Sequence, residues 1–509
     1  MQLCLLEQEC LRVVFGSRNV ENRCMYSLVL VRRSDKAQCI FEAHQDEGML
    51  VVDIPVSAIA ARESRWDVRL RIESAQVEVH NALLSGASVP RNEDRHFFCA
   101  QVARHGVSCY LTESAGSLAL FVAESERHAR MVAAENAREL YPRYLEQLPL
   151  IEDLVFFESF LGKAYAGNPR YIYEALLKKR PDLRCVWSYD GDQTIPGDPI
   201  LVNRRSPDYY RYLAQARFRV NNVIFSVHGK KAETLYIQTW HGTPLKKIAF
   251  DVERPQVDSR ENFYKESGAW SVLLSANVYS TDIFRRAFRY RGAILETGYP
   301  LTDPLLDPEL NRIRRVEALG LPANKRFVLY APTWRDNKPI GDWQYALDLQ
   351  LELDVVSQGL PTDHVLLIKA HHLVSESLDP RSLPYNVIDL SHIDDISQLC
   401  VVADVLITDY SSVFFDFAVT GRPILFYCYD LALYAEDLRG FYLDVHKELP
   451  GPIVESTERL VALLNNLQGV TETYSEKYRA FQQRFCSLND GQVSGRVIDT
   501  LFGGSRGGD

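Results

Sequence analysis

The chain has 509 residues, too many for one hydrophobic core of ordinary size, so its length predicts two or three domains. Hydrophobic residues make up 46% of it and charged residues 24%, the balance of a soluble globular protein. The formal net charge of −10 argues against a protein that binds nucleic acid over a broad surface, although it leaves room for local basic patches.

The ten cysteines form no Cys-x-x-Cys pair and have no zinc-ligand spacing. This scatter is typical of a reducing cytoplasm, where most thiols are buried as small hydrophobic groups. The first residues carry no basic stretch and only a brief apolar run, so no signal peptide is expected. No apolar stretch approaches the roughly 20 residues of a membrane-spanning helix, so any membrane contact is expected to be peripheral.

Residues 1–125 are predicted to form an antiparallel β-sandwich domain. Alternating apolar runs at 26–31, 49–54, 66–72 and 118–122 are separated by polar turns, a spacing typical of such a sandwich. His80, His96 and His105 are too dispersed for a metal site, and no catalytic constellation is evident. Residues 126–150 are predicted to form a polar, helical connector.

Beyond residue 150, strands alternate with helices, which is typical of parallel, doubly wound α/β domains. A first unit, residues 151–322, has predicted strands at 154–159, 183–188, 218–223 and 272–277. A second unit, residues 323–500, has predicted strands at 326–331, 365–369, 404–409 and 424–427. Residues 501–509 are expected to form a flexible tail.

The stretch around His241 is the strongest candidate for chemistry. A buried strand ends at Thr239, a turn follows, and Thr243-Pro244 reads as the N-cap and first residue of a helix. Such turns lie at the carboxyl edge of a sheet, where open α/β folds bind ligands. His241 can exchange a proton near neutral pH, and the predicted helix N-terminus with Lys246 would favour an anion. The alternative is a core histidine bonded to a backbone carbonyl, which the Gly-Thr-Pro turn makes the weaker interpretation.

Three strands of the second unit end in residues suited to holding phosphate. They are followed by Pro332-Thr333-Trp-Arg335, by Lys369-Ala-His371, and by Asp409-Tyr-Ser411-Ser412. If these strands are parallel neighbours, their ends converge on one edge of the sheet. A helix over 413–419 with Gly421 as its C′ residue would place Ser411 and Ser412 at a helix N-terminus, either as an anion site or as plain helix capping.

Two further groups allow more than one interpretation. Arg285, Arg286, Arg289 and Arg291 form either a solvated basic face or a contact with an anionic polymer or lipid surface. The Asp190-Gly-Asp192 turn could bind a divalent cation, but a polar turn is the favoured interpretation, so no metal is predicted.

Several motifs, in order, resemble the CDP-glycerol glycerophosphotransferase family of teichoic acid polymerases. They are Gln238-Thr-Trp-His-Gly-Thr-Pro-Leu-Lys-Lys247, Tyr330-Ala-Pro-Thr-Trp-Arg335, Lys369-Ala-His371, Ile407-Thr-Asp-Tyr-Ser-Ser-Val-Phe-Phe-Asp-Phe417 and Asn489-Asp-Gly491. The resemblance covers residues 150–500. It implies a GT-B fold, in which two Rossmann-type domains face each other across a cleft. Residues 151–322 would be the acceptor side and 323–500 the side that binds the CDP donor.

The resemblance also implies the reaction and the residues that carry it. Glycerol phosphate, or ribitol phosphate in some members, passes from a CDP-activated donor to the hydroxyl end of a growing polymer, and CMP is released. The catalytic histidines fall on His241 and His371. Contacts to the donor fall on Arg335, Ser411, Ser412 and Asp416, and Lys246, Thr333 and Lys369 are added as further substrate contacts because of their positions at the turns.

This chain departs from the family pattern at two places. Gly298-Tyr-Pro-Leu301-Thr-Asp303 has leucine where members often have arginine, and the second histidine motif reads Lys-Ala-His-His. Both departures leave the polyol and the acceptor open. The acceptor is expected to be a lipid-linked or polysaccharide polyol phosphate of a cell wall or capsule.

The chemistry needs no cofactor, because cations and amides can neutralise the phosphates and a histidine can deprotonate the attacking alcohol. The enzyme is expected in the cytoplasm, peripherally bound to the anionic inner face of the cell membrane. Two alternatives remain: a glycosyltransferase or epimerase of the same fold that uses another sugar nucleotide, and a non-catalytic polymer-binding protein.

Overall fold

The computed structural model describes residues 2–6, 10–16, 24–47, 49–60, 63–74, 77–83, 96–112, 117–252, 264–306, 308–333, 339–341, 344–345, 350–370, 380–431 and 440–503. The chain divides into two compact units. One comprises Met1–Pro149 with Arg205–Ala214, and the other comprises Leu150–Arg204 with Gln215–Asp509.

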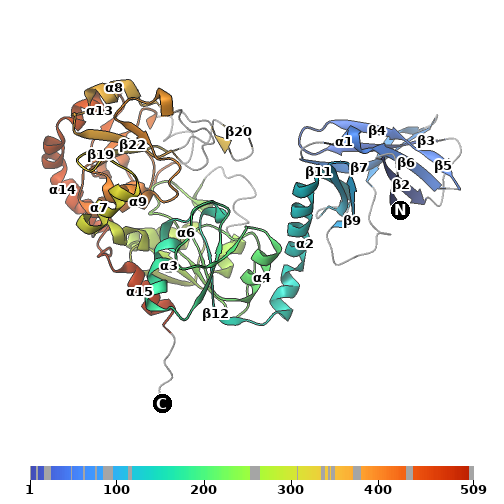
Figure 1. Ribbon diagram of the computed structural model, residues 1–509, viewed down its shortest axis with the longest axis horizontal. Helices are drawn as coiled ribbons and strands as arrows, with labels where there is room; N and C mark the ends of the chain where they lie inside the picture. Colours follow the sequence, from blue (N-terminus) through green and yellow to red (C-terminus); the bar gives the residue numbers. More distant parts are fainter. Residues whose placement is uncertain are drawn as a thin grey trace, which may run out of the picture. The chain divides into compact units, whose positions relative to one another are not determined.

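The N-terminal unit contains two antiparallel sheets (Figure 1). The first has the order β1 (Gln2–Leu6), β2 (Cys10–Gly16), β6 (Met49–Pro55), β5 (His44–Asp46). The second has the order β4 (Gln38–Glu42), β3 (Met25–Arg32), β7 (Glu63–Ser74), β11 (Leu118–Glu124), β10 (His105–Leu111), β9 (His96–Val102), and β8 (Val77–Leu83) also pairs with β7. The expected antiparallel strands are confirmed, since every described pair runs antiparallel.

Both sheets contribute to one hydrophobic core. Leu11 and Val52 from the first sheet are buried in the same cluster as Leu28, Trp66 and Val107 from the second. Alternate residues along these strands point into this cluster, because successive side chains of a strand point to opposite faces. The short helix α1 (Val56–Ile59) adds two more buried side chains.

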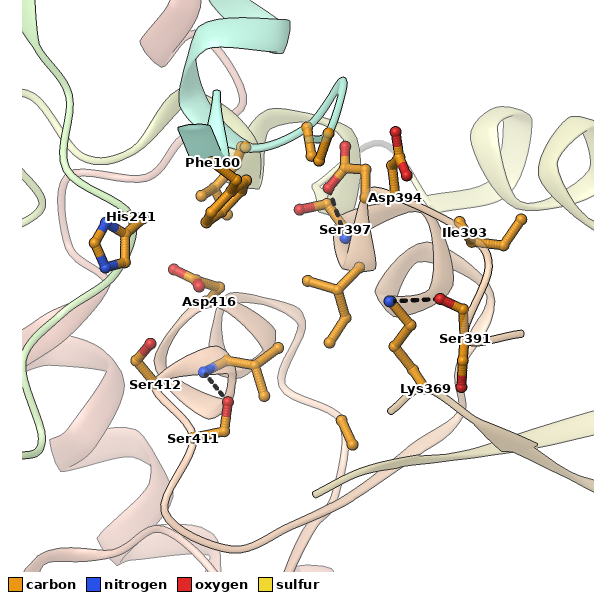
Figure 2. Close-up of a pocket in the computed structure, with 18 of the residues that line it drawn as sticks. Phe160, His241, Lys369, Ser391, Ile393, Asp394, Ser397, Ser411, Ser412 and Asp416 are labelled. Atoms are coloured by element: carbon orange, nitrogen blue, oxygen red, sulfur yellow. Dashed lines mark hydrogen bonds between the residues drawn. The ribbon is translucent and has the colours of Figure 1, made fainter. Parts of the chain in front are cut away.

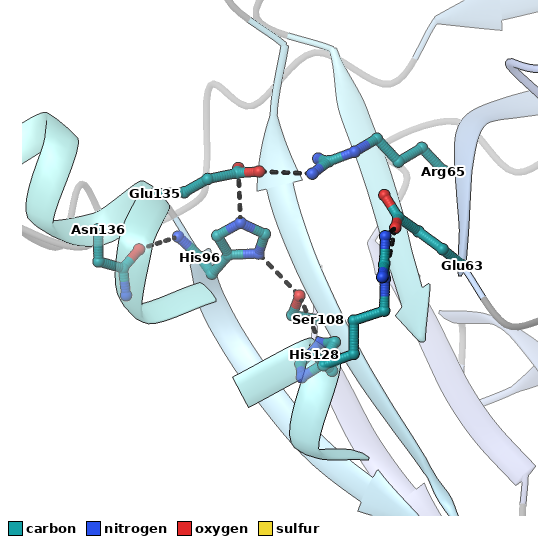
Figure 3. Close-up of polar contacts among 8 residues, drawn as sticks. Glu63, Arg65, His96, Ser108, His128, Glu135 and Asn136 are labelled. Carbon is teal, nitrogen blue, oxygen red and sulfur yellow. Dashed lines mark hydrogen bonds and ion pairs between the residues drawn. The ribbon is translucent and has the colours of Figure 1, made fainter. Parts of the chain in front are cut away.

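Helix α2 (Ser125–Gln147) packs against β9, β10 and β11. A polar group, the His96 cluster, joins the helix to the sheet (Figure 3). It consists of the buried His96, Ser108 and His128 and the partly buried Arg65 and Glu135. Further along the helix, Tyr141 packs against Tyr210 of α4 (Pro207–Gln215), with ring centroids 6.2 Å apart.

The second unit contains two parallel sheets. The first has the order β14 (Ile200–Val202), β13 (Arg184–Ser188), β12 (Ile151–Glu158), β15 (Ala216–Asn221), β16 (Leu235–Gln238), β17 (Val272–Ser275), β18 (Ala293–Glu296). The second has the order β23 (Val387–Asp389), β22 (His364–Ile368), β19 (Arg326–Ala331), β24 (Val405–Thr408), β25 (Ile424–Tyr427), β26 (Ile453–Val454). In both, the strand order reverses beside the first strand, between β12 and β15 and between β19 and β24. This is where open α/β sheets bind ligands.

Helices cover both faces of these sheets (Figure 1). The longer ones are α3 (Gly167–Lys179), α6 (Val278–Ala287), α7 (Pro308–Ala318), α8 (Leu353–Gly359), α9 (Ile396–Val402), α13 (Thr457–Leu464), α14 (Leu467–Phe485) and α15 (Val493–Leu501). The short elements are α10 (Val413–Phe417), α12 (Val445–Glu448), β20 (Pro339–Gly341), β21 (Gln344–Tyr345) and the 3-10 turns η1 (Phe160–Gly162), η2 (Ala249–Asp251), η3 (Pro300–Leu305), η4 (Pro380–Ser382) and η5 (Ala418–Thr420).

The strands are apolar on both sides because both faces are covered. Along β19, Phe327 and Leu329 enter one core cluster, while Val328 and Tyr330 enter the other. The C-terminal helix α15 packs on α3 and the first sheet, where Val497 is buried beside Leu176. The chain therefore crosses back to the first half at its end.

The predicted helix at Thr243-Pro244 is wrong. The backbone after His241 pairs instead with residues 440–442: Lys246 bridges Phe441, Tyr442 N donates to Leu245 O (2.8 Å) and Lys247 N donates to Gly440 O (3.1 Å). These long-range bonds use backbone groups that a helix would need. No helix therefore begins at Thr243-Pro244.

Over the described ranges, no helix combines the length and apolar character needed to cross a membrane.

Candidate active site

A pocket lies between the two parallel sheets, at the carboxyl ends of their strands (Figure 2). Figure 2 shows His241 at one end, Lys369 and Ser391 at the other, and Asp416 between them. The polar lining residues are Lys163, His241, Lys369, Ser391, Asp394, Asp395, Ser397, Ser411, Ser412 and Asp416, and the apolar ones include Phe160, Leu301, Pro332, Ile393, Ile396 and Val413.

His241 follows β16 and lies next to the reversal of the first sheet. Its Nδ1 lies 2.7 Å from the backbone carbonyl of Asn222. A carbonyl only accepts, so Nδ1 carries the hydrogen and Nε2 is left able to take a proton. The ring stacks on Trp240 at 4.2 Å. Burial lowers the pKa of His241 and the Asn222 hydrogen bond opposes that shift, so the imidazole is neutral at pH 7. A neutral, oriented imidazole is suited to act as a general base.

The hydroxyl of Ser412, in the other half, approaches Gly242 beside His241. A Cβ atom on Gly242 would lie only 2.5 Å from Ser412 Oγ, so glycine permits this close approach. The five-residue helix α10 begins after Ser412, whose side chain makes no capping bond. Gly421, at φ 71°, ends the following 3-10 turn in the left-handed conformation, as predicted for the end of this helical segment.

Asp416 projects from α10 into the pocket, and its carboxyl group points toward His241 in Figure 2. Burial, reinforced by the negative charge of Asp395, raises the pKa of Asp416 to about 8. Its carboxyl makes no hydrogen bond or ion pair with any residue in the described parts of the chain. At neutral pH it is therefore a protonated acid that can donate a hydrogen bond to a ligand.

Lys369 directly follows β22, lies at the opposite end of the pocket and is 9% exposed. Its ammonium donates to the carbonyls of Ser391 (3.0 Å) and Ala370 (3.2 Å). Burial lowers its pKa, and the charges of Asp394, Asp389 and Asp395 oppose that shift. Lys369 thus offers positive charge to an anionic ligand.

The structure brings together five of the nine predicted site residues: His241, Lys369, Ser411, Ser412 and Asp416. Thr333 follows a lining residue, Pro332, and donates its backbone N–H to Asp409 Oδ1 (2.9 Å), so it supports the edge of the site. Lys246 is not part of the pocket lining, since it belongs to the pairing with Phe441. Arg335 and His371 lie outside the described residues.

Sequence reasoning missed the wall formed by Asp394, Asp395 and Ser397. These residues follow β23, the neighbour of β22, which Lys369 follows. Because the ends of parallel neighbouring strands lie at the same edge of a sheet, this strand order could have predicted their place in the site. Phe160, which follows β12, was missed in the same way.

Both departures from the family pattern were expected to concern the substrate, and one of them lies in the pocket. Leu301, in the position where members often have arginine, lines the site with 6% exposure, and its backbone N–H donates to Asn168 Oδ1 (3.1 Å). The flanking residues are structural: Asn489 Oδ1 accepts from Tyr299 N (3.0 Å), and Asp303 accepts from the backbone at the start of α15.

Metal ligands are not grouped in the described part of the chain, where no three His, Cys, Asp or Glu side chains are arranged to hold an ion. Asp190, considered above as a possible ligand, accepts hydrogen bonds from Asn203 Nδ2 (3.2 Å) and Arg204 N (3.0 Å) within a turn.

Known proteins resemble this chain over about 70% of its length. It is 40% identical over 362 residues to the teichoic acid poly(glycerol phosphate) polymerase of Staphylococcus epidermidis, which covers 68% of this chain and 50% of that protein. The chain thus spans half the length of that polymerase. It is 39% identical over 376 residues to the teichoic acid glycerol-phosphate transferase of Staphylococcus aureus, covering 71% of this chain and 95% of the transferase.

The solved structure of the wall teichoic acid polymerase TagF superposes with a TM-score of 0.68 at 37% identity, covering 74% of this chain and 95% of that one. The two facing parallel α/β halves described above are therefore shared with a structure of GT-B type. Residues 140–503 match the family described as CDP-Glycerol:Poly(glycerophosphate) glycerophosphotransferase. On this evidence, the chain belongs to the CDP-glycerol:poly(glycerophosphate) glycerophosphotransferase family.

Proposed function

We propose that this protein transfers glycerol phosphate from CDP-glycerol to the hydroxyl end of a growing teichoic-acid-like or capsular polymer and releases CMP. The observation that carries the proposal is one pocket in which a neutral, oriented His241 faces the serine hydroxyls and Asp416 of the opposite half. Two relatives are named as a polymerase and a transferase of glycerol phosphate, and one TagF structure was obtained after a soak with CDPG.

In the proposed reaction the acceptor hydroxyl oxygen attacks the phosphorus of the glycerol phosphate group. The new P–O bond forms as the bond to the phosphate of CMP breaks, and the hydroxyl proton passes to Nε2 of His241. A base in this position contributes about 10²–10⁴-fold to the rate. Ser411, Ser412 and protonated Asp416 donate hydrogen bonds to phosphate oxygens, and Lys369 balances charge on the departing CMP.

Arg335 is proposed to hold the diphosphate, as the family resemblance implies. His371, the second catalytic histidine by the same resemblance, is proposed to contact the diphosphate and stabilise charge on the leaving CMP, because it belongs to the same half as Arg335 and Ser411. Arg335→Ala and His371→Ala should both weaken CDP-glycerol binding more than His241→Ala does, because the latter residue serves the acceptor. Calorimetric titration of the three variants tests this division.

The N-terminal residues 1–125 are proposed to be a β-sandwich accessory domain, joined by the connector at 126–150 to an acceptor-side domain (151–322) and a donor-side domain (323–500). The buried contacts of α15 with the first sheet support adding that helix to the acceptor side. The acceptor is proposed to be a lipid-linked or polysaccharide polyol phosphate, which would bring the protein to the cytoplasmic face of the membrane.

The deciding experiment measures CMP release from CDP-glycerol with a soluble acceptor analogue, beside CDP-ribitol and a UDP-sugar. CMP release with CDP-glycerol supports the proposal, and faster release with CDP-ribitol would reassign the polyol. Turnover of the UDP-sugar alone would indicate a glycosyltransferase or epimerase. If the folded protein binds polymer but turns over none of these donors, it is a polymer-binding protein.

A further inference from the structure

The loop between β23 and α9 forms one wall of the pocket and also reaches the first half. Asp394 Oδ2 accepts the backbone N–H of Tyr165 (3.0 Å) and the hydroxyl of Tyr189 (3.0 Å). Both tyrosines belong to the first half, on the loop before α3 and directly after β13. A carboxylate of the second half is therefore bonded at two points to the first.

The next residue makes a second crossing. Asp395 is 1% exposed, and its Oδ2 accepts the hydroxyl of Tyr171 (2.7 Å) and lies 3.5 Å from Arg170 Nη1. Its other oxygen, Oδ1, accepts the backbone N–H of Ser397 (3.1 Å) and so caps α9 within the second half. One buried carboxylate thus joins α9 to helix α3 of the first half.

Arg170 is held in place for this contact. It is 8% exposed, its Nε donates to Glu174 Oε1 (2.8 Å), and its guanidinium lies over the ring of Tyr165 at 4.8 Å. A buried charge that loses its partner is strongly destabilised. Separating the halves would strip Asp395 of both Tyr171 and Arg170, so these contacts favour the arrangement in which the halves are engaged.

The contacts lie at the end of the pocket away from the catalytic residues. In Figure 2, Asp394 is on the opposite side from His241 and Ser412. The halves also touch at that other end, where Gly242 allows Ser412 to approach. Contacts on both sides of a pocket fix its width, whereas contacts on one side alone would let it open.

We propose that Asp394 and Asp395 form a latch with Tyr165, Tyr171, Tyr189 and Arg170 that holds the two halves at the spacing where His241 meets the donor. These are positioning residues for the reaction proposed above. Only the expected effect on turnover rests on that proposed function; the contacts themselves do not. Because small displacements of reacting groups reduce rates strongly, the latch should act on turnover more than on donor affinity.

Tyr171→Phe and Tyr173→Phe form a matched pair to test the latch. Both residues are buried on α3, and each variant loses one hydroxyl. Tyr173 donates to Pro196 O within the first half, whereas Tyr171 donates to Asp395 of the second. Neither side chain lines the pocket. Tyr171→Phe should lower kcat for CMP release about tenfold with KM for CDP-glycerol within twofold, and Tyr173→Phe should leave both within twofold.

Hydrogen exchange in the full chain provides a readout independent of catalysis. Tyr171→Phe should accelerate exchange of the Ser397 amide and its neighbours, which lie in the other half, and Tyr173→Phe should not. If the wild-type protein releases no CMP, the proposed function fails, but this exchange measurement still tests the latch.

Equal turnover and equal exchange in the two folded variants would overturn the latch. If Tyr171→Phe does not fold, Tyr189→Phe takes its place, since that hydroxyl crosses to Asp394. A folded Tyr189→Phe protein with unchanged kcat and unchanged exchange over 390–397 would equally overturn it.

Discussion

His241 is the residue on which the proposed chemistry depends most directly. His241→Ala should lower the rate of CMP release at least about 10²-fold while donor affinity stays within about threefold, because the lost group is a base for the acceptor. Steady-state kinetics and calorimetric titration of CDP-glycerol measure the two effects. His228→Ala is the matched control, since that histidine of the same half contacts Glu266 and does not line the pocket.

The environment of His241 also sets an expected pH dependence. Burial holds its pKa below the ordinary 6.5, so the neutral, active form persists at mildly acidic pH. The acidic limb of kcat/KM should therefore fall below pH 6.5. A limb at or above pH 7 that His241→Ala abolishes would contradict this assignment.

Asp416 should affect donor binding at alkaline pH. Since its pKa is raised to about 8, it is protonated below that pH and becomes a carboxylate above it, where it repels the donor diphosphate. Affinity for CDP-glycerol should be level near pH 7 and weaken roughly tenfold by pH 9. Asp416→Asn should bind well at both pH values, and Asp190→Asn, in a turn away from the pocket, should keep the wild-type profile. A wild-type affinity independent of pH over this range would contradict the assignment.

The sequence predicts the position of site residues that directly follow strands. It does not predict the position of residues that reach the site only because the two halves meet. His241, Lys369 and Ser411 follow apolar runs, so their position at a sheet edge is readable from the chain. Asp394 and Asp395 resemble any polar loop until Tyr165 and Tyr171 of the other half are placed beside them. Lys246 is not among the residues that line the pocket, and its backbone pairs with Phe441, a partner that is distant in the sequence.

Among the elements, α2 depends on ionisable groups for its attachment. Burial and the nearby His96 lower the pKa of His128 to about 4. Burial alone would raise the pKa of Glu135, but the hydrogen bond from His96 and the charge of Arg65 outweigh it and lower the pKa to about 2. Figure 3 shows these groups joined through Ser108, whose single hydroxyl hydrogen can serve only one histidine at a time.

Acid should therefore loosen α2 from its sheet. Both pKa values are depressed on folding, so the unfolded state binds more protons as pH falls. Because His128 binds a proton more readily in the unfolded state, the free energy of unfolding should fall as pH drops from about 6.5 to 4. The stabilisation from ionised Glu135 should be lost between about pH 4.5 and 2. Hydrogen exchange of the α2 amides, corrected for the intrinsic pH effect, should show protection falling through this range.

His128→Gln is the variant that isolates the first step of this prediction. Its amide can still bond Ser108 but does not titrate, so the loss of protection between pH 6.5 and 4 should flatten. An unchanged acid profile in this variant would show that His128 is not the titrating group.

Strands were easier to predict from the sequence than helix starts. Strands buried on both faces are continuous apolar runs, such as 326–331, which became β19 residue for residue. The Thr243-Pro244 helix signal is purely local, and it lost to hydrogen bonds with residues 440–442 that no local pattern reveals. Tertiary pairing overrode intrinsic preference there.

At the scale of the whole molecule, the two parallel sheets have the strand orders 3-2-1-4-5-6-7 and 3-2-1-4-5-6, counted from the first strand of each, and they bring their reversal points to one pocket. The succession of strands and helices predicts each sheet separately. Their convergence is a property of the assembled unit, fixed by the crossing of α15 and by the contacts of Asp394 and Asp395.

The basic group at the end of α6 and just after it, Arg285 to Arg291, is predicted to attract anionic membranes. All four arginines of the 285–291 group are exposed, although Arg286 pairs with Asp251 (2.9 Å). Each of the others should add about 1 kcal/mol on an anionic surface.

Replacing Arg285, Arg289 and Arg291 with Glu should abolish sedimentation with vesicles rich in anionic lipid at low salt. Replacing Arg314, Arg459 and Arg479, equally exposed but outside the group, should not. Sedimentation that changes neither with salt concentration nor with the fraction of anionic lipid would rule out electrostatic attachment.

Residues 1–137 should be dispensable for turnover of a soluble acceptor. All residues that line the pocket fall between Phe160 and Asp416. A cut at Ser125 would leave Met131 and Val132 of α2 without the buried Tyr110 and Phe121 that they pack against. A chain beginning at residue 138 avoids this and keeps the contact between Tyr141 and Tyr210.

The chain beginning at 138 should therefore release CMP at a rate within about threefold of the full protein. The chain beginning at Ser125 should be equally active but more prone to aggregate, because the apolar side chains of α2 that pack on the sheet are exposed in it. Circular dichroism establishes that each chain is folded, and CMP release is measured with the soluble acceptor. Loss of CMP release in a folded chain beginning at 138 would mean that residues 1–137 take part in catalysis. Loss confined to a lipid-linked acceptor would instead give that unit a role in engaging the natural polymer.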